Sequence, residues 1–209
     1  MSLLHKNWEL IHVFWNRDRF GRQLFQAAFS FLILVFLSFG ICLLFPDVLS
    51  RIMEQVFDWF QQLQVSDSEG KLSAAVILSN NVRACITTIC CGCIPFLYLS
   101  AFSMGINAML LGVMAAYYVA SGHSLLMYAL AILPHGIFEI PALVLSFSLG
   151  LYLCRQVSGR LRSLSTAMPL FLCLRQISRV LLLLVVPLLT VAAVIEAHIT
   201  PALLTAAGF

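Results

Sequence analysis

A histidine and a glutamate lie four residues apart in one of the most apolar parts of the chain, the stretch 132-ILPHGIFEIPA-142. In a helix, side chains at this spacing lie on the same face. His135 and Glu139 can therefore act together, as ligands of a metal ion, as a proton-transfer pair or as contacts for a polar substrate. A proline stands on either side of the pair, at positions 134 and 141.

Further polar residues are set deep in other apolar runs of the chain. They are Asn80, Asn81, Arg83, Asn107 and Glu196. An ionised side chain at mid-bilayer costs about 3 kcal/mol on insertion scales. The charged residues are therefore expected to face one another or a water-filled cavity rather than lipid. One arginine and two glutamates also suggest ion pairing, which makes Arg83 an expected partner of Glu139 and Glu196.

Two interpretations of this polar set remain open. It can be a structural network that locks the helices together, as buried polar side chains do in membrane helix packing. It can also be a site for a metal ion, a proton or a substrate. A divalent metal would take His135, Glu139 and Glu196 as ligands. The spacing is HxxxE rather than the HExxH of zinc proteases, so the sequence leaves the geometry of a metal site open.

The composition identifies the environment of these residues. Of the 209 residues, 61% are hydrophobic and only 10% are charged, whereas soluble domains carry roughly 25% charged residues. Several apolar runs reach the roughly 20 residues that a helix needs to cross a bilayer core. The chain is therefore expected to be an all-α, polytopic transmembrane helical bundle that forms a single integral membrane domain over residues 1–209. It contains no Gly-rich phosphate loop, no serine–histidine catalytic motif and no nucleic-acid-binding module.

The apolar runs predict about five transmembrane spans. Their approximate bounds are 24–45, 72–93, 96–120, 124–153 and 180–202. The fourth span is long and contains Pro134, Gly136 and Pro141, which predict a helix broken near Pro134–Pro141. The CCGC run at 90–93 is interpreted as small residues at a tight helix contact, because a structural zinc site usually needs four ligands.

Three segments outside the spans are amphipathic or basic. Residues 1–23 predict a cytoplasmic or interfacial segment, residues 46–71 an extracytoplasmic interfacial helix and loop, and residues 154–179 a basic cytoplasmic loop. Both the N-terminal flank and the 154–179 loop are rich in arginine, so the positive-inside rule puts them in the cytoplasm. Four spans separate them, which agrees with a shared side. The fifth span then puts the C-terminus outside the cytoplasm, as expected of this multi-pass cell-membrane protein.

Four short motifs resemble the stage II sporulation protein M family: SNN at 79–81, GIN at 105–107, PHGIFEIPA at 134–142 and IEAHITP at 195–201. The resemblance implies a multi-pass helical membrane protein. In spore formers the family's namesake works in engulfment, with peptidoglycan-degrading proteins at the septal membrane. The positions that match the family's motifs are Asn80, Asn81, Asn107, Pro134, His135, Gly136, Glu139, Pro141 and Glu196.

Three functional hypotheses follow, in this order. The first is a membrane scaffold that binds the bilayer, organises cell-wall remodelling partners and is a candidate homo-oligomer, by analogy with the family. The second is a transporter or channel subunit that uses His135, Glu139 and Glu196 as an ion, proton or substrate site. The third is an intramembrane metal-dependent hydrolase, which would need a bound divalent metal.

Overall fold

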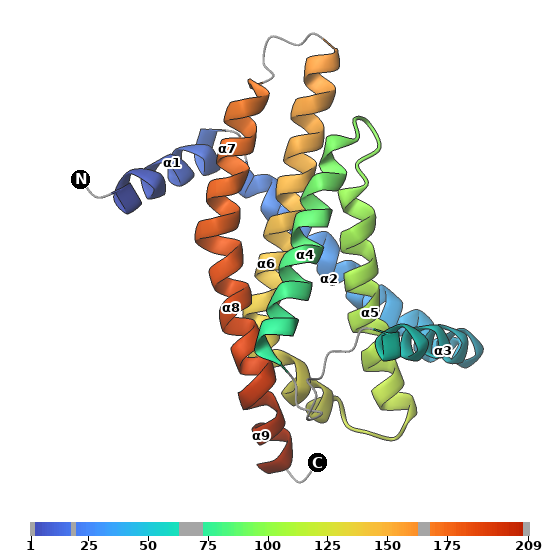
Figure 1. Ribbon diagram of the computed structural model, residues 1–209. Coiled ribbons are helices and arrows are strands. Elements are labelled where there is room, and N and C mark those ends of the chain that lie inside the picture. The colour runs from blue at the N-terminus through green and yellow to red at the C-terminus, as the bar shows by residue number, and fades with distance from the viewer. Residues whose placement is uncertain (1–2, 18–19, 63–72, 163–167, 207–209) are drawn as a thin grey trace.

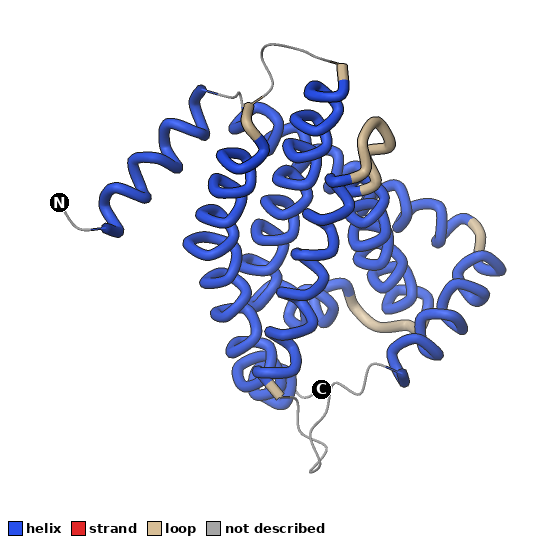
Figure 2. The backbone as a smooth tube through the Cα atoms, turned by 45° about the horizontal axis from the view of Figure 1, so that its top comes forward, coloured by secondary structure: helices blue, strands red, loops and turns tan. Residues whose placement is uncertain are grey.

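Every element of the structure is helical in the residues that it describes, which are 3–17, 20–62, 73–162 and 168–206 of this computed structural model (Figures 1 and 2). Five helices are long and apolar enough to cross a membrane. These spans are Phe20–Leu44 (α2), Ala74–Cys93 (α4, Ala74–Cys90, with the 3-10 turn η1, Cys91–Cys93), Ser100–Ala120 (α5), Leu125–Leu161 (α6) and Leu170–Ala206. The predicted all-α bundle with about five spans is confirmed.

Helix α6 is the centre of the bundle, and α2, α4, α5 and the last span all contact it. The most apolar stretch of α6 is 61% buried inside the protein, against 22–33% for the other spans. With 37 residues, α6 is about 55 Å long, which exceeds the roughly 30 Å of a bilayer core. Its ends therefore extend beyond the hydrocarbon region.

The predicted break in the fourth span is wrong, because α6 runs without interruption through Pro134 and Pro141. Each proline removes one backbone hydrogen bond and crowds the carbonyl four residues before it, which a long helix can accommodate by bending. The first turns of α6 lie at an angle to the rest of the helix (Figure 1). A bend after these first turns thus replaces the expected break.

The last span is one continuous helical run of five segments. They are α7 (Leu170–Val180), η2 (Leu181–Val185), α8 (Val186–Val194), η3 (Ile195–Ile199) and α9 (Thr200–Ala206). Both η2 and η3 are π-helical turns, and each ends two residues before a proline, Pro187 or Pro201. We attribute the wide turns to these prolines, because a π turn relieves the clash between the proline ring and the carbonyl four residues earlier.

The basic segment 154–179, expected to be a loop, is helical at both ends in the structure. Residues 154–161 continue α6, and residues 170–179 belong to α7. The helical spacing of Cys173, Ile177 and Val180, all buried, explains α7, because apolar residues at this period form a face that packs on the bundle. Residues 163–167 lie outside the described part of the chain.

Two amphipathic helices pack on opposite ends of the bundle (Figure 1). Helix α1 (Leu3–Arg17) buries Ile11 and Phe14 in the same apolar cluster as Phe20 and Tyr152. The guanidinium of Arg179 donates from Nε to Asn7 Oδ1 at 3.1 Å, which joins α7 to α1. Helix α1 therefore lies at the arginine-rich end of the bundle, where α6 ends and α7 begins.

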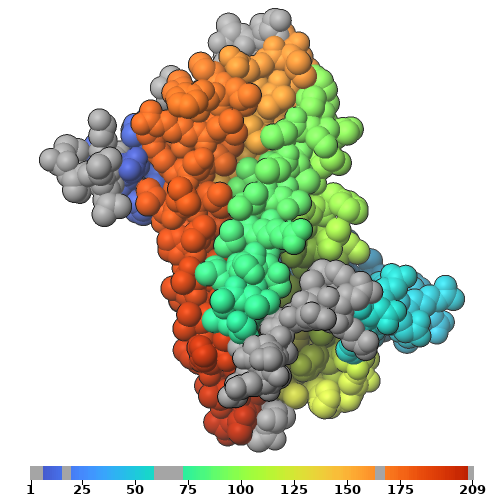
Figure 3. Space-filling view, in the orientation of Figure 1, coloured from blue at the N-terminus to red at the C-terminus, as the bar shows by residue number. Residues whose placement is uncertain are grey.

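Helix α3 (Pro46–Gln62) packs against α2 and α5 at the other end. Its buried residues Leu49, Met53 and Val56 form one apolar cluster with side chains of α2 and α5. The rest of the helix stands out from the side of the molecule (Figure 3). The predicted helix in segment 46–71 is thus present as far as residue 62, and residues 63–71 lie outside the described ranges.

Close helix packing is made possible by glycine at two contacts. A Cβ atom on Gly92 would collide with the backbone carbonyl of Gly150, and one on Gly112 would collide with Ser38 and Val35 of α2. Small residues of this kind let membrane helices approach closely. The contact at Gly92 agrees with the packing interpretation of the CCGC run.

Candidate functional site

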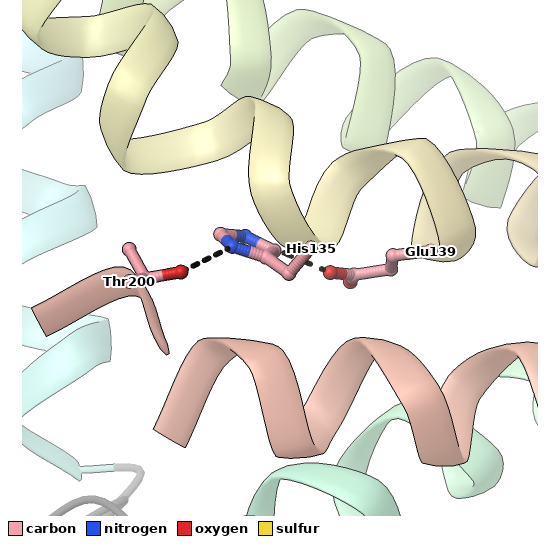
Figure 4. Close-up of polar contacts among 3 residues, drawn as sticks. All are labelled: His135, Glu139 and Thr200. Atoms are coloured by element: carbon pink, nitrogen blue, oxygen red, sulfur yellow. Dashed lines mark hydrogen bonds and ion pairs between the residues drawn. The ribbon is translucent and has the colours of Figure 1, made fainter. Parts of the chain in front are cut away.

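Three of the predicted polar residues come together in the structure, from two spans that are distant in sequence. His135 and Glu139 lie on α6, and Glu196 lies in the π turn η3. One ligand atom from each residue lies within 4.8 Å of the other two. Thr200, the first residue of α9, completes the group that we call the intramembrane cluster: His135, Glu139, Glu196 and Thr200. Figure 4 shows three of them, His135, Glu139 and Thr200.

The cluster forms because residues at the same four-residue spacing on two helices face one another. Helix α6 and the last span run antiparallel, and each contributes two side chains four residues apart. His135 meets Thr200, with 3.5 Å between Nδ1 and Oγ1, while Glu139 lies opposite Glu196. Next to the cluster the two helices carry small buried residues, which favour a close approach; these are Ala142, Ala192 and Ala193.

The side chains of the cluster are mostly shielded from solvent. His135 is 8% exposed and Thr200 7%, whereas the side chain of Glu139 is 22% exposed. The Nε2 atom of His135 lies 4.0 Å from Oε2 of Glu139. This distance permits electrostatic attraction when the imidazole is charged, but it is too long for a hydrogen bond. The glutamates thus sit close together with few polar partners.

Local sequence explains how each side chain reaches the cluster. Pro134 directly precedes His135, at the bend of α6, and is half-buried, whereas Pro141 is exposed. Gly136 is buried, and a Cβ atom there would meet only Ile132 and Ile140 of the same helix. Glu196 lies in the wide turn before Pro201. Because a π turn shifts the direction of the side chains that follow one another along a helix, we expect this turn to contribute to the placement of Glu196 against α6.

Arg83 does not join the cluster, so the predicted ion pairing is wrong. Its side chain is exposed on α4, and within the described residues it makes no ion pair with either glutamate. The buried positions of α4 include Ile77 and Cys85. Arg83 is two residues from Cys85, about 200° around the helix, and therefore lies on the opposite face.

The three asparagines also lie apart from the cluster's contacts. The Asn107 amide donates from Nδ2 to the carbonyl of Ser103 at 2.9 Å, within its own helix. Asn80 and Asn81 are half-buried on α4, which contacts η3. No hydrogen bond joins either of them to the cluster in the part of the chain that is described.

Thr200 is the member of the cluster that the sequence analysis missed. Its signal was the spacing to Glu196, which repeats the four-residue spacing of His135 and Glu139 on the facing helix. The arrangement as a whole offers an imidazole nitrogen, two carboxylates and a hydroxyl. Such a set can hold a cation, share a proton or lock two helices by polar contacts.

Comparison with known proteins identifies one similarity. Residues 27–201 match the model of the family described as Stage II sporulation protein M. No curated protein and no solved structure matches the chain. The matched region includes all four residues of the intramembrane cluster and leaves out α1.

Proposed function

Because this chain belongs to the stage II sporulation protein M family, we propose that it is a multi-pass membrane scaffold that gathers cell-wall remodelling proteins at the cell membrane. The multi-pass architecture is shared by the structure and the family. The partners and the organising role are inferred from the family's namesake, which works with peptidoglycan-degrading proteins. In this proposal the wall chemistry belongs to the partners.

The main support for the proposal is the way in which α3 packs on the bundle. Leu49, Met53 and Val56 anchor the helix to α2 and α5, and the ring of Phe57 contacts Tyr117 at 5.6 Å between centroids. The other side of α3 is polar and exposed, and carries Arg51, Glu54, Gln55 and Asp58. A firmly held helix with a free polar face is suited to contact with another protein.

The proposed orientation puts this face on the side of the cell wall. The arginine-rich end of the bundle, with α1 and α7, belongs in the cytoplasm by the positive-inside rule. Helix α3 is at the opposite end (Figure 1). Partners that act on the wall would therefore meet α3.

Site-specific photo-crosslinking in intact cells tests the scaffold. A photoreactive amino acid at Glu54 or Asp58, both exposed on α3, is expected to capture proteins that bind or cleave peptidoglycan, identified by mass spectrometry. The matched control carries the same amino acid at Arg175, exposed on α7 at the other end. Capture of no wall-active protein from α3, or equal capture from both ends, would contradict the proposal.

A second candidate function is ion transport, favoured by the position of Glu196 in a π turn. Such turns are frequent at functional sites, and midplane polar residues mark ion pathways in transporters. Protein reconstituted in liposomes should then carry a cation or proton flux that Glu196→Gln abolishes. Vesicles with wild-type protein that leak no faster than empty ones would exclude this function.

A further inference from the structure

We propose that His135, Glu139 and Glu196 bind one divalent transition-metal ion, such as Zn²⁺ or Mn²⁺, with Thr200 orienting the imidazole. The proposal stands on the geometry and charge of the cluster and does not depend on the scaffold role. The scaffold role involves α3 and gives these four side chains no function, whereas a bound metal ion would give them one.

The distances within the cluster fit a shared ion better than direct contacts. The Nε2 atom of His135 and the Oε2 atom of Glu139 are 4.0 Å apart, beyond hydrogen-bond range. All three ligand atoms lie within 4.8 Å of one another. Two ligands of a tetrahedral zinc ion, each about 2.1 Å from the metal, are about 3.4 Å apart, so small side-chain movements would complete the site.

The negative charge of the two carboxylates also favours binding of a cation. Two carboxylates lie together in a bundle of apolar helices, and within the described residues no lysine or arginine pairs with them. Arg83, which the sequence predicted as their partner, is exposed on the opposite face of α4. One divalent ion would neutralise both carboxylates, and a neutral imidazole would add a ligand without adding charge.

Contact with Thr200 favours the orientation and the tautomer of the His135 imidazole that can bind a metal ion. Its hydroxyl oxygen lies 3.5 Å from Nδ1 of His135. When Nδ1 carries the proton, its N–H can donate a hydrogen bond to the hydroxyl oxygen of Thr200, and the Nε2 atom keeps a free lone pair. The nine-tenths buried side chain of His135 then presents this lone pair to the carboxylates. Metal-binding histidines are commonly oriented by such an outer contact.

The donor set indicates the class of ion. One nitrogen and two carboxylate oxygens suit zinc, manganese and similar ions, whereas a calcium site uses oxygen ligands alone. Three protein ligands leave at least one coordination position for water, which is the arrangement of reactive rather than structural zinc sites. The partial exposure of the Glu139 side chain, 22%, leaves an edge of the site uncovered.

The test uses the full chain, purified in detergent and stripped of metal with a chelator. ZnCl₂ and, separately, MnCl₂ are titrated by calorimetry, and bound metal is measured by elemental analysis after gel filtration. We expect saturable binding of one ion per chain and a melting temperature several degrees higher with the ion present. Absence of saturable binding of both ions would overturn the proposal.

Matched variants separate a metal site from adventitious binding. Glu139→Gln and Glu196→Gln keep the shape of the side chain and should weaken binding at least 100-fold. Thr200→Val should weaken it about 10- to 100-fold through the orientation of His135. The control Glu9→Gln makes the same change at an exposed carboxylate on α1 and should bind like the wild type. Equal affinity of Glu196→Gln and the wild type would refute the site.

Thermal melting distinguishes a metal site from a structural network even if one variant folds poorly. Without metal, Glu196→Gln should melt no lower than the wild type, because it removes one of two neighbouring charges. With metal, the wild type and Glu9→Gln should gain stability, whereas Glu196→Gln should not. A metal-free Glu196→Gln protein that melts several degrees below the metal-free wild type would favour a structural network and count against the proposal. Photo-crosslinking at α3 would be unaffected by either result.

Discussion

At the scale of single residues, the placement of charge decides which side chains belong to the cluster. Glu139 and Glu196 lie together in the bundle, whereas Arg83 lies exposed on another face of α4. Removing one member of a buried ion pair typically costs 3–5 kcal/mol, whereas removing a charge that has no partner in the bundle carries no such cost, because a membrane span disfavours an unpaired charge. Replacement of Arg83 therefore distinguishes an arginine that pairs with the glutamates from one that lies apart from them.

Arg83→Gln should not lower the free energy of unfolding by more than about 0.5 kcal/mol. The side chain is exposed and makes no ion pair with the cluster in the described part of the chain, and losing an unpaired charge from a membrane span is not unfavourable. The measurement is thermal or denaturant unfolding in detergent, with metal binding as a second readout. A loss of several kcal/mol, or of metal binding, would restore Arg83 as the partner of the glutamates.

Glycine contacts allow a second prediction at this scale. Gly92→Ala should destabilise the protein by about 1–3 kcal/mol, because its new methyl group would collide with the carbonyl of Gly150. The matched control is Gly105→Ala, where an added Cβ atom would meet nothing within 4 Å beyond the backbone of its own helix and the helix propensity of alanine is higher. Unfolding in detergent measures both. Equal losses in the two variants would mean that the close contact does not limit packing.

The residues of the site were only partly predictable. His135, Glu139 and Glu196 were expected together because ionised groups in a membrane need partners. Depth along a helix follows from residue count, but the direction in which a side chain points depends on which face packs inward. That is why Arg83 and Asn107, which also lie within apolar spans, do not contact the cluster.

At the scale of elements, the last span combines regular helix with two π turns, each associated with a proline. The turn η3 carries Glu196 and precedes Pro201, while η2 precedes Pro187 and carries no ionisable residue. The chain thus contains the same device twice, once at the cluster and once away from it. The turn η2 with Pro187 therefore serves as a control for the turn η3 with Pro201.

Pro201→Ala should weaken metal binding while stabilising the helix. Alanine restores the backbone donor and removes the ring, so the turn can return to α-helical geometry and rotate Glu196 away from α6. We expect affinity to fall at least tenfold by calorimetry, without loss of helicity by circular dichroism. Pro187→Ala, at the other turn, should leave affinity unchanged. Identical affinity in both variants would show that η3 does not position Glu196.

Element boundaries show where sequence reasoning succeeds and fails. The five spans were predictable because a bilayer demands long apolar runs. Helix α7 was missed because its arginines suggested a loop, although Cys173, Ile177 and Val180 already had helical spacing. The continuity of α6 was missed because a proline predicts a lost hydrogen bond, while neighbouring helices determine whether the helix breaks or bends.

At the scale of the whole molecule, the bundle has two distinct ends. One end carries α1, the start of α7 and exposed arginines that include Arg160 and Arg175; the other carries α3. The sequence alone could suggest this polarity from arginine counts. The packing of α1 and α3 on the bundle required the structure, because it depends on contacts between segments distant in sequence.

Cysteine labelling should place the two ends on opposite sides of the membrane. In a background with the seven native cysteines replaced, Arg51→Cys on α3 should react with a membrane-impermeant maleimide in intact cells. Arg160→Cys at the end of α6 should react only after permeabilisation. Both residues are exposed, so access to reagent is comparable. Labelling of both cysteines in intact cells would contradict the proposed orientation.

The division of the cluster between α6 and the last span has a consequence for how the protein is made. A ribosome adds roughly 5–20 residues per second, so α6 reaches the translocon seconds before Glu196 has been synthesised. If α6 were released alone, Glu139 would face lipid without its neighbours from the last span. We therefore expect the insertion machinery to retain α6 until the last span arrives, so that both helices enter the bilayer as one hairpin.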